Sequence, residues 1–458
     1  MLVKTFGSAV QGIDARLITV EVDIGKGAKA QLIGLPDNAV KESLTRIYAA
    51  LKNSGYSFPR TGLIVNMAPA DIKKEGSNYD LPIALGILAA SKQIDPSLLD
   101  ATLCMGELSL DGTLLPITGS LPIAIQAKKD RFQRLIVPKE NGREAGIVQG
   151  LDVFACADLT EAISVLEQSE LHRSVQVNPR EEFSHEQHKF SMDFSDVKGQ
   201  DNVKRAMEIA AAGGHNIILI GPPGAGKTML AKRLNTILPP MNLHEALEST
   251  KIHSVAGKLN KNTALMAHRP FRSPHHTISN VALVGGGHHP KPGEISLAHN
   301  GVLFLDELPE FKRSVLEVLR QPLEERKIGV ARAKFSVEYP SSMMLVASMN
   351  PCPCGYFNHP DKECVCPPGA VQKYLAKVSG PLLDRIDIHI EVTPVDHDEL
   401  SNTTKTTDSE SIRQRVIRAR QRQEHRFDAL PALHTNAQMN SPQIRETCQL
   451  DQSGTVLL

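Results

Sequence analysis

The spacing of apolar residues over positions 1–171 predicts a mixture of strands and helices. Apolar and polar residues alternate over 18–24, as in a strand with one buried face. Asp37 precedes an apolar stripe at helical spacing that stops at Gly55, so we expect Asp37 to cap a helix there. Further elements are predicted at 63–67 (strand), 80–91 (helix) and 135–138 (strand). Together these elements indicate an α+β domain.

The pattern changes after residue 193. Continuous apolar runs at 217–220, 302–305 and 344–348 are typical of strands that are buried on both faces of a parallel sheet. The predicted elements between and after them are a helix at 312–325, a hairpin at 327–337 and an alternating strand at 386–392. The fold class is therefore α/β. The expected domains are an α+β domain at 1–171, a polar linker at 172–192, an α/β core at 193–395 and a partial helical lid at 396–458.

A glycine-rich segment lies between the run at 217–220 and a helical pattern that begins at Met229. Its residues are Gly221, Pro222, Pro223, Gly224, Ala225, Gly226, Lys227 and Thr228. In a GxxxxGK[ST] segment between a strand and a helix, successive backbone N–H groups turn inward onto the β- and γ-phosphates of a nucleotide. Lys227 would add a positive charge, and the Thr228 hydroxyl would be a ligand for Mg²⁺.

Two carboxylates, Asp306 and Glu307, follow the apolar run at 302–305. At the end of a buried parallel strand the first can hold the Mg²⁺ that bridges the phosphates, and the second can orient and deprotonate the attacking water. Asn350 ends the run at 344–348, where its amide can orient that water or touch the γ-phosphate. Together with Lys227, these residues predict hydrolysis of the nucleotide rather than binding alone.

Two further segments are candidates for nucleotide contact. The segment 194–200, which contains Val197, is expected to line the adenine pocket, with a surface turn as the alternative. Arg385 stands at the start of the strand at 386–392, where it could act on ATP bound to a neighbouring subunit.

Basic residues that could contact DNA lie in three places. Arg332 and Lys334, near the tip of the predicted hairpin, could grip a DNA backbone because phosphate contact is electrostatic and independent of sequence. A solvated hairpin tip is the alternative. For the basic and aromatic segment 268–276, DNA contact and a structural loop or subunit contact are equally favoured by the sequence. For the arginine-rich helix at 413–426 we favour a solvated, salt-bridged face.

Charge and cysteine usage limit the class of protein. The chain has 51 basic and 51 acidic residues, which excludes a uniformly basic coat for nucleic acid. No apolar run is long enough to span a membrane and no signal peptide follows Met1, so we expect a cytoplasmic protein without a membrane partner. Two CxC pairs in a Gly/Pro-rich loop at 352–366 predict a tetrahedral Zn²⁺ site, with unliganded thiols as the alternative. The four ligands would be Cys352, Cys354, Cys364 and Cys366.

The motif Met-Gly-Glu-Leu-Ser-Leu-Asp-Gly at 105–112 resembles the proteolytic domain of the Lon protease. Where Lon carries its nucleophilic serine in a Gly-Pro-Ser-Ala-Gly turn, this chain has Gly-Ser-Asn-Tyr-Asp at 76–80. Pro122 stands near the position expected for the catalytic lysine, and proline has no amine to act as a base. The resemblance implies a Lon-like fold at 1–171 without an evident catalytic dyad.

Several motifs after residue 193 resemble one branch of the AAA+ ATPases. They are Arg-Pro-Phe-Arg at 269–272, Pro-His-His at 274–276, and the segments 292–299, 350–355 and 379–392. Together with the first domain, they make nearly the whole chain resemble the ComM/YifB family, the magnesium-chelatase-like branch of these ATPases.

This resemblance implies a homo-hexameric helicase that uses ATP and Mg²⁺ and acts on single-stranded and branched DNA. Such a helicase promotes branch migration during natural transformation, with recombination proteins as further partners. The hairpin at 327–337 also resembles the pre-sensor hairpin of MCM helicases. The family's second sensor arginine would lie on a later helix than this sequence reaches, so hydrolysis that depends on the lid is an open point here.

Two other functions compete with a DNA motor. A chelatase-like or chaperone-like AAA+ motor would act on a protein partner, and stimulation of ATP hydrolysis by DNA would separate it from a helicase. A non-catalytic scaffold conflicts with the intact set of Lys227, Asp306 and Glu307.

Overall fold

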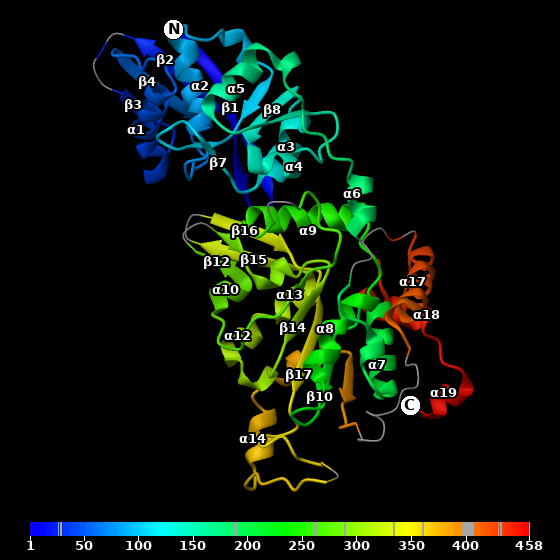
Figure 1. Cartoon of the computed structure of the whole chain (residues 1–458). Coiled ribbons are helices and arrows are strands. Elements are labelled where there is room, and N and C mark those ends of the chain that lie inside the picture. Colours follow the sequence, from blue (N-terminus) through cyan, green and yellow to red (C-terminus); the bar gives the residue numbers. More distant parts are fainter. Residues whose placement is uncertain are drawn as a thin grey trace. The chain divides into compact units, whose positions relative to one another are not determined.

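The structure is a computed structural model that describes residues 1–25, 27, 30–186, 190–260, 263–287, 290–332, 335–359, 361–395, 407–428, 430 and 433–457. For residues 184–186, 331, 332, 335 and 336 it describes the backbone alone. The chain forms two compact units (Figure 1). Unit 1 comprises Met1–Gln187, Asn242–Ala267 and Pro290–Pro292, and unit 2 comprises His188–Met241, His268–His289 and Gly293–Leu458.

Unit 1 is built on a seven-stranded mixed sheet with the order β3-β4-β2-β1-β5-β8-β9. Its strands are β1 (Leu2–Gln11), β2 (Asp14–Gly25), β3 (Ala30–Ile33), β4 (Gly62–Ala68), β5 (Thr102–Cys104), β8 (Arg134–Pro138) and β9 (Asp152–Cys156). The shorter strands are β6 (Glu107–Leu108), β7 (Leu114–Leu115) and β13 (Lys291–Pro292). The helices are α1 (Asn38–Asn53), α2 (Asp80–Ala90), α3 (Ser120–Lys129), α4 (Gly142–Ala145), α5 (Leu159–Glu167), α6 (Pro179–Glu186) and α9 (Leu243–Val255).

The local predictions for unit 1 follow its burial pattern. In β2 the inward residues Ile18, Val20 and Val22 are fully buried, as the alternation predicts. Asp37 caps α1, because its carboxylate accepts a hydrogen bond from the Val40 amide at 2.8 Å. Helix α2 is buried on all sides, so it forms the centre of the core rather than an amphipathic cover.

Two segments differ from the expected domain boundaries. Helix α6 occupies part of the segment predicted as an irregular linker. Helix α9 follows α8 (Lys227–Ile237) in sequence but belongs to unit 1. Polar contacts tie the end of α9 to other parts of unit 1: the Gly119 amide, just before α3, donates to the Ser254 carbonyl at 3.3 Å, and the Ser254 hydroxyl donates to the buried carboxylate of Glu144 in α4.

Unit 2 contains a five-stranded sheet with the order β11-β14-β17-β10-β18, and all its neighbouring strands are parallel. These strands are β10 (Ile217–Ile220), β11 (Phe271–Arg272), β14 (Val302–Leu305), β17 (Met344–Met349) and β18 (Ile388–Glu391). The predicted apolar runs form β10, β14 and β17, which are almost entirely buried. Because the strands are parallel, their carboxyl ends lie along one edge of the sheet, which we call the carboxyl edge.

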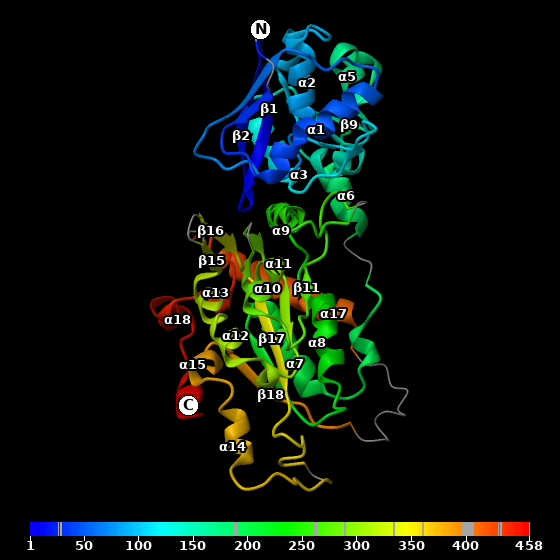
Figure 2. The same cartoon turned by 90° about the vertical axis from the view of Figure 1, so that its left-hand side faces the viewer.

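The remaining elements of unit 2 surround this sheet. They are α7 (Asp201–Gly213), α8 (Lys227–Ile237), α10 (Asn280–Val284), β12 (Gly285–Gly286), α11 (Glu294–Leu297), α12 (Arg313–Glu317), α13 (Arg320–Glu325), α14 (Ala370–Leu375), α15 (Gly380–Leu383), α17 (Ser409–Arg426), α18 (Ser441–Thr447) and α19 (Gln452–Leu457). The predicted hairpin forms from β15 (Lys327–Arg332) and β16 (Phe335–Pro340). Within unit 2, this hairpin and α14 lie at opposite ends (Figures 1 and 2).

One helix prediction in unit 2 was too long. The segment 312–325 forms the two short helices α12 and α13 instead of one, and the chain turns between them at Val318 and Leu319. Among the described residues, no helix is both long and apolar enough to cross a bilayer.

Candidate active site

The glycine-rich segment 221–228 forms the connection between β10 and the first turn of α8 at the carboxyl edge, and we call it the phosphate loop after its predicted role. Gly224 and Gly226 have φ values of +83° and +86°, which side-chain-bearing residues rarely adopt, and Gly226 directly precedes the first residue of α8, Lys227. At Gly221 an added Cβ would lie 2.2 Å from the Val392 carbonyl oxygen. Glycine is therefore required both for the turn and for close packing against the chain after β18. The resulting helix N-terminus offers unpaired N–H groups to an anion.

The Lys227 ammonium lies inside this loop. Its Nζ donates to the carbonyls of Gly221 and Pro222 at 2.7 and 2.8 Å and to Asn350 Oδ1 at 3.0 Å. Burial lowers the pKa of Lys227 from its ordinary value, while the nearby carboxylates act in the opposite direction. The structure thus brings Lys227 and Asn350 together, although 123 positions separate them in sequence.

Asp306 sits at the end of β14, beside the first turn of α8. The Thr228 hydroxyl donates to Asp306 Oδ2 at 2.7 Å, and the Ser348 hydroxyl donates to Asp306 Oδ1. The same Ser348 oxygen accepts from the Glu307 amide at 3.4 Å. Hydroxyl and carboxylate oxygens are the ligands that Mg²⁺ prefers, so Thr228 and Asp306 fit the predicted Mg²⁺ site. Ser348 was not predicted as part of the site, because nothing in its local sequence marks it.

Glu307 follows Asp306 directly, and its amide donates to Asp306 Oδ1 at 3.1 Å while its side chain is exposed to solvent. Its φ is +54°, and its side chain is 59% exposed. Its carboxylate lies 3.7 Å from His276 Nδ1, and the His276 ring packs against His275 and edge-on to Phe311. An exposed carboxylate next to the phosphate loop can accept a proton from water. The sequence placed His276 in a signature motif but gave no sign that it meets Glu307.

Val197 and Met229 are the remaining residues predicted to contact the nucleotide. Val197 is buried; its amide donates to the Phe194 carbonyl at 3.0 Å, and its carbonyl accepts from Lys204 Nζ at 2.7 Å. Met229 lies in the first turn of α8 and is 39% exposed. The contact of Val197 with the adenine base stays a prediction.

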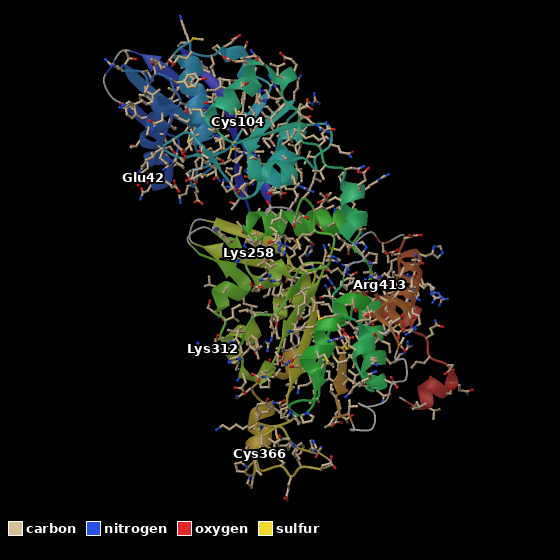
Figure 3. All side chains as sticks on the ribbon, in the orientation of Figure 1. Glu42, Cys104, Lys258, Lys312, Cys366 and Arg413 are labelled. Carbon is tan, nitrogen blue, oxygen red and sulfur yellow. The ribbon has the colours of Figure 1, made fainter. Side chains whose placement is uncertain are left out.

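The four predicted zinc ligands come together after β17. The Sγ atoms of Cys352, Cys354, Cys364 and Cys366 all lie within 4.8 Å of one another. Three Sγ–Sγ distances are 3.3, 3.8 and 3.6 Å, close to the edge of about 3.8 Å of a tetrahedron with Zn–S bonds of about 2.3 Å. In Figure 3, Cys366 marks this loop beside α14.

Backbone amides support a thiolate set in this loop. The Gly355 and Phe357 amides donate to Cys352 Sγ at 3.2 and 3.3 Å. The Tyr356 amide lowers the pKa of the Cys354 thiol to about 6, whereas backbone hydrogen bonds at Cys364 and Cys366 are outweighed by burial and the neighbouring thiols, which raise the pKa of both. The donors therefore fit a soft divalent cation such as Zn²⁺.

The cysteine loop also touches the nucleotide site. At Gly355, whose φ is +87°, an added Cβ would lie 2.5 Å from Pro223 Cδ in the phosphate loop. The loop returns through α14, where the Tyr374 side chain is hydrogen-bonded by the Asn350 backbone. The loop is thus held to the phosphate loop and to Asn350.

Arg385 is the one predicted catalytic residue that the structure does not bring to this site. It precedes β18, which runs parallel to β10 in the register Ile217↔Ile388, so it lies at the amino edge of the sheet. Four strand residues, roughly 13 Å, separate that edge from the phosphate loop. The guanidinium pairs with Glu324 and donates to the Pro381 carbonyl.

The candidate DNA contacts have mixed outcomes. Lys334 lies outside the described residues, and for Arg332, at the end of β15, the backbone alone is described. In the segment 268–276 the arginines are structural: Arg269 donates to the Asn300 carbonyl at 2.7 Å, and Arg272 pairs with Glu294 at 2.6 Å. A structural role is therefore favoured for both arginines.

The arginines of α17 form ion pairs and hydrogen bonds with other residues of unit 2. Arg413, labelled in Figure 3, pairs with Glu410, and Arg415 forms two hydrogen bonds with Glu208 at 2.7 and 3.0 Å. Arg420 donates to a carbonyl of α7 at 2.8 Å. These contacts agree with the salt-bridged face that the sequence favours.

Comparisons with known proteins cover both units. The family model for magnesium chelatase, subunit ChlI, matches residues 193–400, and related ChlI models match 20–141 and 406–458. The chain is 43% identical to YifB of Escherichia coli (strain K12) over 98% of this chain and 87% of that protein. It is 41% identical to the competence protein ComM of Haemophilus influenzae (strain ATCC 51907 / DSM 11121 / KW20 / Rd), over 100% of this chain and 88% of ComM.

The chain belongs to the magnesium-chelatase-like ComM/YifB family. The predicted fold class is confirmed: an α/β protein whose AAA+ module has a parallel sheet. The chain is also 29% identical to Lon protease 2 of Bacillus subtilis (strain 168), over 46% of this chain and 35% of the protease. Membership of the ComM/YifB family implies ATP and Mg²⁺ as the ligands of the site described above.

Proposed function

We propose that this protein is an ATP-driven DNA helicase that acts as a homo-hexamer and promotes branch migration when transforming DNA is integrated by recombination. The observation that carries the proposal is the convergence of Lys227, Asn350, Asp306 and Thr228 at the carboxyl edge of one parallel sheet. The similarity to ComM, whose name assigns it to competence, gives the proposal its biological setting. We place the protein in the cytoplasm, where chromosomal DNA is.

In this proposal each residue of the site has one task. The phosphate loop binds the β- and γ-phosphates through its amides and through Lys227. Thr228 and Asp306 would hold Mg²⁺, which would neutralise negative charge on the phosphates. Glu307 accepts the proton of the attacking water, and Asn350 orients that water beside Lys227.

Arg385 serves the ATP of a neighbouring subunit in this proposal. Within its own chain it lies at the sheet edge opposite the phosphate loop, so it reaches a nucleotide only across an interface. A cation from the neighbour would offset the charge that develops on the γ-phosphoryl group. ATP hydrolysis is then coupled to assembly of the ring.

DNA contact is assigned to the hairpin β15–β16. Arg332 and Lys334 would provide contacts to the phosphate backbone, which carry no sequence preference. A motor that moves branch points through unrelated sequences needs contacts of this kind.

The cysteine loop is proposed to hold Zn²⁺ through its four thiolates. Its role is structural, because all four positions of a tetrahedral ion are filled by protein. The contacts of Gly355 with Pro223 and of Tyr374 with Asn350 support the proposal that this loop stabilises the nucleotide site.

The test is the ATPase rate with no DNA and with single-stranded, double-stranded and forked DNA. A DNA motor is expected to show a higher rate with DNA, highest with forked DNA. A normal basal rate that no DNA raises would contradict the helicase. That result would favour a chelatase-like or chaperone-like motor acting on a protein, which the match to magnesium chelatase models keeps as the second candidate.

A further inference from the structure

We propose that Glu324 is a positioning residue that holds Arg385 within its own chain until DNA moves the hairpin. This inference rests on the proposed function, in which Arg385 acts on a neighbour's ATP and the hairpin binds DNA. It adds a link between the two: a carboxylate at the root of the hairpin competes with the neighbour's phosphate for the same guanidinium.

The first observation is that the guanidinium of Arg385 already has partners within its own chain. Its Nη2 pairs with Glu324 Oε1, and its Nη1 donates to the Pro381 carbonyl. Its Nε is buried without a hydrogen-bond partner among the described residues. Both terminal nitrogens are therefore engaged inside the chain, and a guanidinium beside a carboxylate presents a smaller net charge to a phosphate.

The second observation is the place of Glu324 in the chain. It lies in α13, which ends at Glu325, and β15 begins at Lys327. Arg326, between them, is fixed at the hairpin root: its carbonyl accepts from the Ser341 amide at 2.8 Å, and its Nη1 donates to Ser342 Oγ at 3.2 Å. A displacement of the hairpin root therefore moves the end of α13 and Glu324 with it.

The third observation is that the backbone of Arg385 is fixed, whereas the carboxylate paired with its side chain is half exposed. Asn216 Nδ2 donates to the Arg385 carbonyl at 2.8 Å, and Asn216 Oδ1 accepts from the Leu345 amide at 2.8 Å. This amide bridges the starts of β10, β17 and β18. Glu324, in contrast, is 51% exposed, so its pair with Arg385 can open without unfolding the sheet. The guanidinium can then pair either with Glu324 or with the phosphate of the neighbour's nucleotide. Movement of the hairpin and binding of that nucleotide would both shift the equilibrium between these two states.

The experiment compares Glu324→Gln with Glu325→Gln in the full-length protein. Glu325 is the matched control, because it lies in the same helix and its Oε2 accepts from Gln321 Nε2 at 2.9 Å. We expect Glu324→Gln to raise the DNA-free kcat by about two- to fivefold, the range that a partly exposed ion pair allows. The KM for ATP and the kcat at saturating DNA should stay at the wild-type level, so the stimulation by DNA falls. Glu325→Gln should leave all three values unchanged.

The direction of action is tested in mixed rings. A Lys227→Ala chain supplies only the arginine, and an Arg385→Ala chain supplies only the nucleotide site. Adding Glu324→Gln to the first chain should raise the DNA-free rate, and adding it to the second should not. A rise in the second case would overturn the inference, because Glu324 would then act on its own subunit's site.

The failures of the two proposals are distinguishable. If the wild type is stimulated by DNA but the DNA-free rate of Glu324→Gln is equal to or below that of the wild type, the inference is wrong and the helicase stands. If the wild type is not stimulated by any DNA and Glu324→Gln still raises the rate, the competition for Arg385 stands and the helicase is wrong.

Discussion

Replacing Ser348 by alanine tests whether its buried hydroxyl orients Asp306 in the nucleotide site. The Ser348 side chain is fully buried; its hydroxyl donates to Asp306 Oδ1 and accepts from the Glu307 amide at 3.4 Å. The Ser348 hydroxyl therefore contacts both the proposed Mg²⁺ ligand and the backbone of the proposed base, whose amide also donates to Asp306 Oδ1 at 3.1 Å. Ser348→Ala removes both contacts without removing any group that would touch ATP.

The magnitude follows from the charge on Asp306. A hydrogen bond to a charged group contributes about 1.5–3 kcal/mol, which corresponds to about a ten- to hundredfold change in rate or affinity. We expect kcat/KM for ATP to fall by that factor, with a higher Mg²⁺ concentration needed for half-maximal rate. The assay is phosphate release measured over a Mg²⁺ titration.

Ser341→Ala is the matched control for this change. Ser341 is also fully buried and lies close to the other end of β17, but its hydroxyl has no hydrogen-bond partner among the described residues. Its removal should leave the kinetics unchanged. If Ser348→Ala retains kcat/KM and the Mg²⁺ dependence of Ser341→Ala, the hydroxyl does not orient Asp306, and the reasoning is refuted.

Three other predictions concern the same site. Glu307→Gln should retain ATP binding and lose turnover by about a hundredfold or more, because the amide cannot accept the proton of water; near-normal turnover would remove Glu307 from its role. Arg385→Ala should keep nucleotide affinity and lose hydrolysis by about a thousandfold, and mixing it with Lys227→Ala should restore activity in mixed rings. Rings that form without recovery would reassign Arg385 to structural support. Finally, elemental analysis should find one zinc per chain, and Cys354→Ser should lower that content; metal-free protein from both aerobic and anaerobic preparations would disprove the site.

The local chemistry of this protein could be predicted from sequence. The phosphate loop, Asp306 with Glu307, and the cysteine pairs are short segments whose residue types and spacing carry the information. The apolar runs at 217–220, 302–305 and 344–348 gave the central strands, because strands that are buried on both faces leave a continuous apolar pattern. The cap at Asp37 could also be predicted, because a helix cap joins residues that are only three positions apart in sequence.

Local pattern was a weaker guide where tertiary contacts compete with it. The apolar spacing over 312–325 suited one helix, yet the chain breaks it into α12 and α13. Helix α9 is a second example. It belongs to unit 1 and not to the unit of its sequence neighbours, and the hydrogen bond between Ser254 and Glu144, 110 positions apart, is one of the contacts that local sequence does not reveal.

The contacts between distant residues were decided by the order of strands in the sheet. β17 lies between β14 and β10, and only this order puts Ser348 against Asp306 and Asn350 against Lys227. The parallel register of β18 with β10 places Arg385 at the amino edge, and the path of α13 brings Glu324 to it. Sequence spacing determines which residues share one strand or helix turn, whereas the packing of apolar faces selects which elements become neighbours, and that selection depends on the whole core at once.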